Sequence, residues 1–161
     1  MRPLDADARR ERRPPRVAVI LLVEDEAGDQ ELTRRALLDG KIEKELYVAK
    51  DGEEALDYLL RRGRYADGKR WPLPDLILLD LNLPRLDGRQ FLARVKAEPR
   101  LRRIPVVVLT TSRQDKDVVQ SYEAGASSYI VKPTTVDQSL KLAQALETYW
   151  FEAVRLPPLE D

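Results

Sequence analysis

Four apolar stretches of this sequence are each followed by polar side chains that could do chemistry together. In chain order these are Glu24 and Asp25 after VAVILLV, Asp80 after DLILL, Thr110 after PVVVL, and Lys132 after SYIV. A carboxylate at the end of an apolar run is unexpected, because an unpaired charge that leaves water is costly. Carboxylates that lie close together also repel unless a cation sits between them. A cation site, a carboxylate, a hydroxyl and an ammonium are groups suited to phosphoryl transfer.

The amino-acid composition restricts which cation and which acceptor such a site could use. The 161 residues include no His and no Cys, so neither imidazole nor thiolate is available as a ligand or a phosphoryl carrier. Oxygen ligands alone favour a hard divalent ion, and we expect Mg²⁺. Because a carboxylate can accept a phosphoryl group as an acyl phosphate, we expect Asp80 to be the acceptor. The alternative is that Asp80 only ends a strand.

The segments between these polar residues alternate between two patterns. Continuous aliphatic and β-branched runs predict buried strands at 17–23, 45–49, 75–79, 105–109 and 128–131. Apolar residues at helical spacing predict helices at 29–38, 52–62, 90–96, 115–124 and 135–153. This alternation predicts an α/β fold with a doubly wound five-stranded parallel sheet flanked by five helices. The carboxyl ends of parallel strands meet at one edge, so the polar residues would meet there.

Length and charge limit the domain organisation and the partners. Residues 1–16 include six Arg and little to bury, which predicts a disordered tail before one domain at 17–154 and a C-terminal tail at 155–161. The 28 basic and 28 acidic residues cancel, which argues against a nucleic-acid binder. No run approaches the ~20 apolar residues of a membrane helix. Together with the absence of Cys, this leads us to expect a cytoplasmic protein with no membrane partner.

Four motifs resemble the receiver domain, the response-regulator half of bacterial two-component signalling. They are VEDE at 23–26, LLDLNLPRLDG around Asp80, VVLTTS around Thr110 and AGASSYIVKP at 124–133. The resemblance implies a flavodoxin-like fold in which Asp80 accepts a phosphoryl group from a sensor histidine kinase. The remaining roles that it implies are Mg²⁺ binding by Glu24, Asp25, Asp80 and the backbone carbonyl of Asn82, and phosphoryl binding and switching by Thr110, Lys132 and Tyr129.

The resemblance leads us to expect a single-domain response regulator that signals through a conformational change. Such a domain is not a conventional enzyme, although it supports phosphotransfer to itself and its own dephosphorylation. One rival is an Mg²⁺-dependent phosphatase with an aspartyl-phosphate intermediate, which normally has a second Asp where this chain has Asn82. Another is a flavodoxin-like cofactor binder, whose first loop would be rich in hydroxyls, whereas residues 24–26 are acidic. A third is a receiver used only as a scaffold. The resemblance also implies a cis Lys132–Pro133 bond.

Two segments are similar to the stand-alone response regulators that accompany bacterial phytochromes, so the kinase partner would be a bacteriophytochrome. Residues 61–74 form a long connection with five basic residues and two aromatic residues. They would either contact a partner or form an exposed loop with Trp71 packed back on the domain. The last helix ends in Tyr149, Trp150 and Phe151, and we expect the sheet to leave Trp150 and Phe151 uncovered. We expect this end of the helix, together with the face of the fourth helix (115–124) and the fifth strand (128–131), to form a homodimer contact. The alternative is that these aromatic residues cap this domain's own core.

Overall fold

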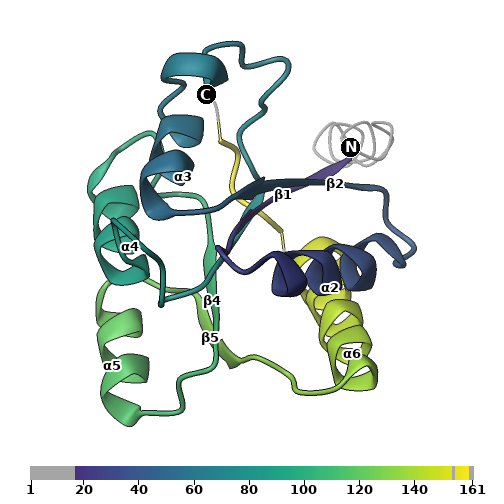
Figure 1. Ribbon diagram of the computed structural model, residues 1–161. Coiled ribbons are helices and arrows are strands. Elements are labelled where there is room, and N and C mark those ends of the chain that lie inside the picture. The colour runs from purple at the N-terminus through teal and green to yellow at the C-terminus, as the bar shows by residue number, and fades with distance from the viewer. Residues whose placement is uncertain (1–16, 154, 160–161) are drawn as a thin grey trace, which may run out of the picture.

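Five parallel strands form one sheet in the computed structural model, which describes residues 17–153 and 155–159 (Figure 1). The strands are β1 (Ala18–Val23), β2 (Lys44–Ala49), β3 (Leu76–Leu79), β4 (Val106–Thr110) and β5 (Ser128–Val131). Their order across the sheet is β2-β1-β3-β4-β5, and every pairing is parallel. The chain therefore reverses its direction of travel across the sheet between β1 and β3, as in a doubly wound fold.

Helices cover both faces of this sheet. On one face lie α3 (Gly52–Leu59), α4 (Gly88–Ala97) and α5 (Asp115–Glu123), and on the other lie α2 (Ala27–Leu38) and α6 (Val136–Glu147) (Figure 1). Helix α2 packs against α6, and α3 packs against α4. The expected fold class, a five-stranded parallel sheet flanked by five helices, is confirmed. No helix in the described part of the chain is long and apolar enough to cross a membrane.

The sheet separates two apolar cores, because successive residues of a strand point to opposite faces. In β1, Leu21 and Val23 belong to the core that includes α3 and α4, which we call the α3–α4 core. Ile20 and Leu22 belong to the core that includes α2 and α6, the α2–α6 core. Strands β1, β3 and β4 are buried along their whole length, whereas the edge strand β5 is half-buried. Burial on both faces explains why these strands are continuous apolar runs in the sequence.

N-terminal caps fix where the helices begin, and with them the loops along the carboxyl edge of the sheet. Asp87 accepts a hydrogen bond from the backbone of Gln90, and the Gln90 side chain accepts one in return from the Asp87 backbone. Asp51 and Thr135 cap α3 and α6 through their side-chain oxygens. Each such cap typically contributes about 1 kcal/mol. The caps therefore hold the loops before α3, α4 and α6 in place.

The connection at 61–74 packs back onto the domain. It contains a short 3-10 helix, η1 (Gly63–Tyr65), and the ring centroids of Tyr65 and Trp71 lie 4.9 Å apart in an edge contact. Trp71 also contacts Tyr58 on α3, with the ring centroids 6.0 Å apart. Of the two arrangements expected for this segment, the structure has the one in which Trp71 lies against the domain. A partner contact by its basic side chains stays a prediction.

The end of α6 differs from the expectation. The helix changes at Thr148 to a π-helix, η2 (Thr148–Ala153). Trp150 is only 9% exposed and belongs to the α2–α6 core, against which Phe151 also packs. The expectation that the sheet leaves these two aromatic residues uncovered is therefore wrong. The physical reason is that an indole packed among apolar neighbours removes a large apolar area from water. Tyr149 is 56% exposed.

The terminal segments are described only in part. Residues 1–16, which we expect to be a disordered tail, lie outside the described residues. Residues 155–159 form no helix or strand, but Leu156 packs against the α2–α6 core and Leu159 against the α3–α4 core. The segment after η2 therefore contacts both sides of the domain.

Candidate functional site

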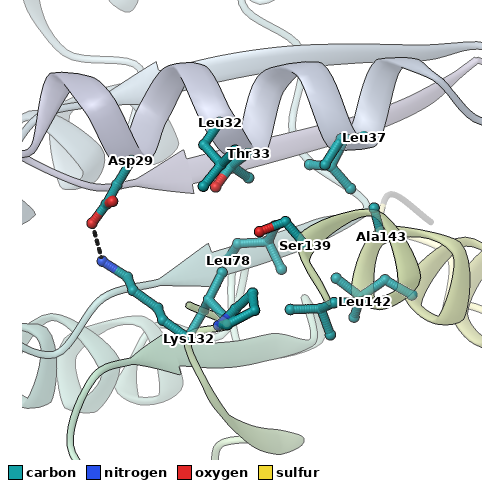
Figure 2. Close-up of a pocket in the computed structure, with 13 residues that line it drawn as sticks. Asp29, Leu32, Thr33, Leu37, Leu78, Lys132, Ser139, Leu142 and Ala143 are labelled. Carbon is teal, nitrogen blue, oxygen red and sulfur yellow. Dashed lines mark hydrogen bonds and ion pairs between the residues drawn. The ribbon is translucent and has the colours of Figure 1, made fainter. Parts of the chain in front are cut away.

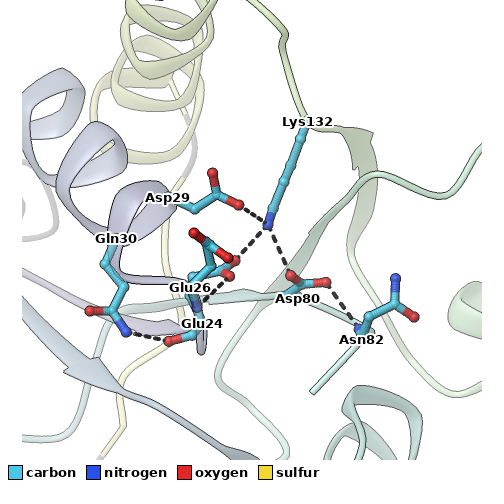
Figure 3. Close-up of polar contacts among 7 residues, drawn as sticks. All are labelled: Glu24, Glu26, Asp29, Gln30, Asp80, Asn82 and Lys132. Carbon is cyan, nitrogen blue, oxygen red and sulfur yellow. Dashed lines mark hydrogen bonds and ion pairs between the residues drawn. The ribbon is translucent and has the colours of Figure 1, made fainter. Parts of the chain in front are cut away.

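The polar residues that follow the strands meet at one edge of the sheet, and Figure 3 shows three of them pointing toward one another. Glu24 and Asp25 follow β1, Asp80 follows β3, Thr110 ends β4, and Lys132 follows β5. The backbone N–H of Lys132 donates to the carbonyl of Thr110 at 2.8 Å, which fixes these two strand ends side by side. Glu24, Asp80 and Thr110 are buried, whereas Asp25 is exposed. The parallel topology therefore assembles the group of residues that the sequence predicts.

The Lys132 ammonium donates hydrogen bonds to three carboxylates (Figure 3). Its Nζ lies 2.7 Å from Glu24 Oε2, 2.9 Å from Asp29 Oδ2 and 2.9 Å from Asp80 Oδ2. Burial acts to lower the pKa of Lys132, but the hydrogen bonds to the three carboxylates outweigh it and raise the pKa overall. The side chain therefore remains an ammonium, suited to binding anionic oxygens and unsuited to accepting a proton.

Glu24 is held in place by both its side chain and its backbone. Its Oε1 accepts the backbone N–H of Glu26 at 3.1 Å, and its backbone carbonyl accepts the Gln30 side-chain amide at 2.5 Å. Burial raises the pKa of Glu24 to about 7, although the hydrogen bond from Lys132 acts in the opposite direction. The negative charge of Asp80 raises the pKa further. A nearby cation would favour the charged form of Glu24.

Three carboxylates form a group with the geometry of a metal site. One oxygen from each of Glu24, Asp25 and Asp80 lies within 4.8 Å of the others. Together with Asp29, the site holds four carboxylates, three of which contact the ammonium of Lys132, so negative charge remains in excess after this ammonium is counted. Ligand oxygens alone, with the exposed Asp25 open to solvent, suit a hard divalent cation. The residues present therefore fit such an ion.

Asp80 is positioned by the loop that follows it. The backbone N–H of Asn82 donates to Asp80 Oδ1 at 3.0 Å. A Cβ added at Gly88 would lie 2.4 Å from the backbone oxygen of Asp80 and 2.6 Å from Leu81 Cα, so no larger residue fits there. This close approach accounts for the glycine in the LNLPRLDG segment. The role of the Asn82 carbonyl as a metal ligand stays a prediction.

The hydroxyl of Thr110 is buried without a partner. Thr110 is 0% exposed, and its Oγ1 makes no hydrogen bond with any part of the chain that the structure describes. A buried polar group that lacks a hydrogen bond costs about 1–3 kcal/mol. Such a group at the edge of an acidic cluster is free to bond to an anionic ligand that enters the site.

Tyr129 connects β5 to the loop that follows Thr110. Its hydroxyl donates to the backbone carbonyl of Ser112 at 2.9 Å. The Ser112 hydroxyl donates to Asp117 on α5 at 2.6 Å, and Asp117 also accepts a hydrogen bond from Arg89 on α4. These hydrogen bonds lower the pKa of Asp117, the one from Ser112 most strongly. The β4–α5 loop is thus attached to Tyr129 on one side and to α5 on the other, and the same Asp117 joins α5 to α4.

One residue of the site was not predicted from the sequence. The helical pattern was expected to start at Asp29, but α2 starts at Ala27, which places Asp29 within the first turn, beside Lys132. An acidic residue in the first turn of a helix is ordinary, because it interacts favourably with the helix dipole. The feature of the sequence that could have indicated Asp29 is its position, five residues after Glu24 and beyond the end of the same strand.

The expected cis bond between Lys132 and Pro133 is not found, since no peptide bond among the described residues is cis. This expectation is therefore wrong. The trans form of an X–Pro bond is favoured by about 0.5–1 kcal/mol. Lys132 reaches all three of its carboxylate partners from the trans form.

Comparison with known proteins agrees with this geometry. The family model of the response regulator receiver domain matches residues 20–144. The chain belongs to this receiver family. Response regulator Rcp1 from Synechocystis sp. is 45% identical to this receiver over 147 residues, which are 91% of this chain and 97% of Rcp1. FilR2 of Methanothrix harundinacea, a probable methanogenesis regulatory protein, is 39% identical over 86% of this chain and 87% of its own.

Solved structures show the same similarity. The phosphorylated cyanobacterial phytochrome response regulator RcpA matches this receiver with a TM-score of 0.83 and 40% identity, over 89% of this chain and 100% of RcpA. The Mn²⁺-bound form of Rcp1 matches with a TM-score of 0.80 and 45% identity, over 88% of this chain and 99% of that one. This receiver is therefore similar along most of its length to stand-alone response regulators of phytochrome systems.

Proposed function

We propose that Asp80 of this receiver accepts a phosphoryl group from a sensor histidine kinase. The observation that carries this proposal is the position of the Asp80 carboxylate, which accepts a hydrogen bond from Lys132 and lies close to the carboxylates of Glu24 and Asp25. In the transfer, an Asp80 oxygen bonds to phosphorus while the bond from phosphorus to the kinase's histidine nitrogen breaks. Lys132 and the Thr110 hydroxyl bind oxygens of the resulting acyl phosphate. The same site supports later hydrolysis of that phosphoryl group by water.

We infer that Glu24, Asp25, Asp80 and the backbone carbonyl of Asn82 bind Mg²⁺. The support is an all-oxygen set of ligands with excess negative charge, together with the Mn²⁺-bound form of the similar protein Rcp1. A bound divalent cation supplies positive charge that stabilises the transferring phosphoryl group. The part of this chain's own residues is to hold the cation beside Asp80.

We infer that phosphorylation acts through Thr110 and Tyr129. A hydrogen bond from Thr110 Oγ1 to a phosphoryl oxygen would pair a buried hydroxyl and draw the β4–α5 loop toward Asp80. Because Tyr129 is bonded to Ser112 in the same loop, that movement changes the contacts of Tyr129. Thr110→Ala should still accept the phosphoryl group, but the change in chemical shift of Tyr129 on phosphorylation should be largely lost.

The kinase partner that we propose is a bacteriophytochrome. The support is the similarity to RcpA and to RtBRR, a bacteriophytochrome response regulator that is 43% identical over 89% of this chain with a TM-score of 0.70.

The rival function, an Mg²⁺-dependent phosphatase, is not favoured, because Asn82 stands where a second catalytic carboxylate is expected. We propose that the phosphorylated receiver passes the signal on by contacting partner proteins.

The phosphoacceptor proposal is tested with a small acyl phosphate and Mg²⁺. Wild-type protein should gain a single phosphoryl group that is stable in acid and labile in base, measured by intact mass. Asp80→Asn should gain none, whereas the matched control Asp87→Asn, which keeps a good cap for α4, should label as the wild type does. Equal labelling of Asp80→Asn would rule out Asp80 as the acceptor.

We also propose a homodimer, whose contact keeps the expected face of α5 and β5 but not Trp150. Trp150 is buried, so among the aromatic residues at the end of α6 the exposed Tyr149 is the candidate. Val119 and Tyr122 on α5 are 53% and 50% exposed, beside the half-buried edge strand β5. Exposed apolar residues near a sheet edge favour association. Light scattering should give a dimer that Val119→Ser/Tyr122→Ser weakens, and a monomer before and after phosphorylation would contradict the proposal.

A further inference from the structure

Asp29 is a fourth carboxylate of the site with no role among those that the proposed function assigns. Its Oδ2 lies 2.9 Å from Lys132 Nζ, and its side chain is 43% exposed, against 13% for Lys132. It belongs to α2, whereas Lys132 follows β5, 103 residues away. This ion pair therefore joins two elements that flank the site.

The position of Asp29 differs from that of the other two partners of Lys132. Glu24 and Asp80 belong to the group of carboxylates that could hold a metal ion, and Asp29 lies outside that group. Glu24 and Asp80 would hold a divalent cation through their carboxylate oxygens, and its positive charge would repel the ammonium of Lys132. Because Asp29 lies outside the carboxylate group that would hold the cation, its hydrogen bond to Lys132 would not compete with the cation and would persist in the loaded site.

The surroundings of the pair also limit where Lys132 can move. Figure 2 shows Asp29 and Lys132 at one end of a cleft between α2 and α6, whose other walls include Leu37, Leu78 and Leu142. An ammonium that left Asp29 in this direction would meet only the hydroxyl residues Thr33 and Ser139 among the apolar side chains and no carboxylate, which is unfavourable for a charge. The carboxylate of Asp29 is therefore the negatively charged partner on the α2 side of this cleft that keeps the ammonium next to Asp80.

We propose that Asp29 is a positioning residue that acts through Lys132. By holding one N–H of the ammonium, it keeps Lys132 beside Asp80 when a divalent cation occupies Glu24 and Asp80, and it leaves the other N–H groups for a phosphoryl oxygen. This inference rests on the proposed function for its effect on phosphorylation. Its structural part, that Asp29 anchors Lys132 in the loaded site, stands apart from that function.

The first measurement follows the Lys132 ammonium itself by ¹⁵N NMR. In the wild type its protons should stay protected from exchange with water both without and with saturating Mg²⁺. In Asp29→Asn they should be protected without Mg²⁺, because Glu24 and Asp80 still bind the ammonium, and should exchange freely once Mg²⁺ is added. The matched control is Glu26→Gln, which removes a neighbouring negative charge outside the contacts of Lys132. Retained protection in Mg²⁺-loaded Asp29→Asn would overturn the proposal.

The second measurement is a cycle of four proteins: wild type, Asp29→Asn, Lys132→Met and the double variant. The rate of phosphorylation by an acyl phosphate at saturating Mg²⁺ should fall by about tenfold in Asp29→Asn, a coupling typical of charged groups in direct contact. In the Lys132→Met background the same change should have no further effect. An equal loss in both backgrounds would show that Asp29 acts directly on the metal or the phosphoryl group, and would overturn the proposal.

The two measurements separate this inference from the proposed function. If Asp80→Asn still accepts the phosphoryl group, the proposed function fails while the exchange experiment continues to test the anchoring role. If Asp80 is the acceptor and Asp29→Asn behaves as Glu26→Gln does in both measurements, only the inference fails.

Discussion

Two lysines of this protein have largely buried side chains but differ in how much negative charge surrounds them. Lys44, at the start of β2, has a side chain that is 1% exposed, and it donates to the carbonyls of Leu37 and Ile42 and to Glu147 Oε2. Lys132 has a side chain that is 13% exposed, and its three acceptors are all carboxylates. One lysine faces one negative charge, and the other faces three.

This difference in surrounding charge distinguishes a structural ion pair, at Lys44, from a binding site, at Lys132. The Lys44–Glu147 pair has no net charge, and Glu147 also accepts the backbone N–H of Ile42 at 2.6 Å, so the pair joins α6 to the start of β2 and needs nothing further. Around Lys132 the negative charge is in excess, and the hydroxyl of Thr110 has no hydrogen-bond partner within residues 17–153 and 155–159. A site with excess charge and an unpaired hydroxyl gains from binding a cation and an anionic oxygen.

The largest expected effect follows from breaking the Lys44–Glu147 ion pair. Lys44→Met leaves Glu147 buried without its cation, and removal of one partner from a buried pair costs about 3–5 kcal/mol. Urea unfolding should show this loss, and addition of Mg²⁺ should not restore it. Lys132→Met should lose less in the presence of a chelator, and Mg²⁺ should restore most of that loss. A Mg²⁺-dependent rescue of Lys44→Met, or none for Lys132→Met, would contradict the comparison.

The next effect concerns cation binding at the site with excess charge. Asp25→Asn removes a proposed ligand, so Mg²⁺ affinity should fall by at least the roughly 10–100-fold that loss of an outer partner of a metal site costs. Because the substitution also relieves repulsion with Glu24 and Asp80, the metal-free protein should not be destabilised. Titration followed by NMR measures the affinity. The control Glu147→Gln, in the balanced pair, should bind Mg²⁺ as the wild type does, and an unchanged affinity in Asp25→Asn would contradict the assignment.

The smallest expected effect is a pH dependence of opposite sign in the two regions. Burial raises the pKa of Glu24 from 4.5 to about 7, so between these pH values the metal-free folded state binds more protons than the unfolded state. Its contribution to the free energy of unfolding therefore falls as pH rises through this range. For Glu147, burial acts to raise the pKa, but hydrogen bonds from Ile42 and Lys44 lower it overall. Its contribution is present above pH 4.5 and is lost as pH falls.

The free energy of unfolding, measured in a chelator from below pH 4.5 to above pH 7, checks the sign of the pH dependence in each region. Glu24→Gln should abolish the decrease in stability toward neutral pH, and Glu147→Gln should abolish the decrease toward acid pH. If both substitutions changed the same side of the stability profile, the contrast between the two regions would be wrong.

The fold and most of the site could be predicted from the sequence, because both depend on local patterns. Buried parallel strands are continuous apolar runs, and parallel topology brings the residues after each run, such as Glu24, Asp80 and Lys132, to one edge. Strand β5 was predicted with its observed bounds, 128–131. The residues that a strand delivers to its carboxyl end can thus be derived without knowledge of the packing.

The features that the sequence did not predict depend on packing between distant segments. Asp29 looks like an ordinary residue of a first helical turn until the fold brings the start of α2 beside Lys132. Lys44 and Glu147 are 103 residues apart, and nothing in the local pattern of either indicates the other. The burial of Trp150 depends on how η2 returns to the α2–α6 core, which helical periodicity does not specify.

The central claim is that the carboxylate of Asp80, among all acidic residues at this edge, takes the phosphoryl group. Borohydride reduces an acyl phosphate to an alcohol, so a phosphorylated aspartate becomes homoserine, which peptide mass spectrometry locates. After reaction with an acyl phosphate and Mg²⁺, homoserine should appear at Asp80 and at no other aspartate, and it should not form when Mg²⁺ is chelated. Homoserine at Asp25 or Asp29, or a borohydride-resistant phosphoryl group on Thr110, would contradict the claim.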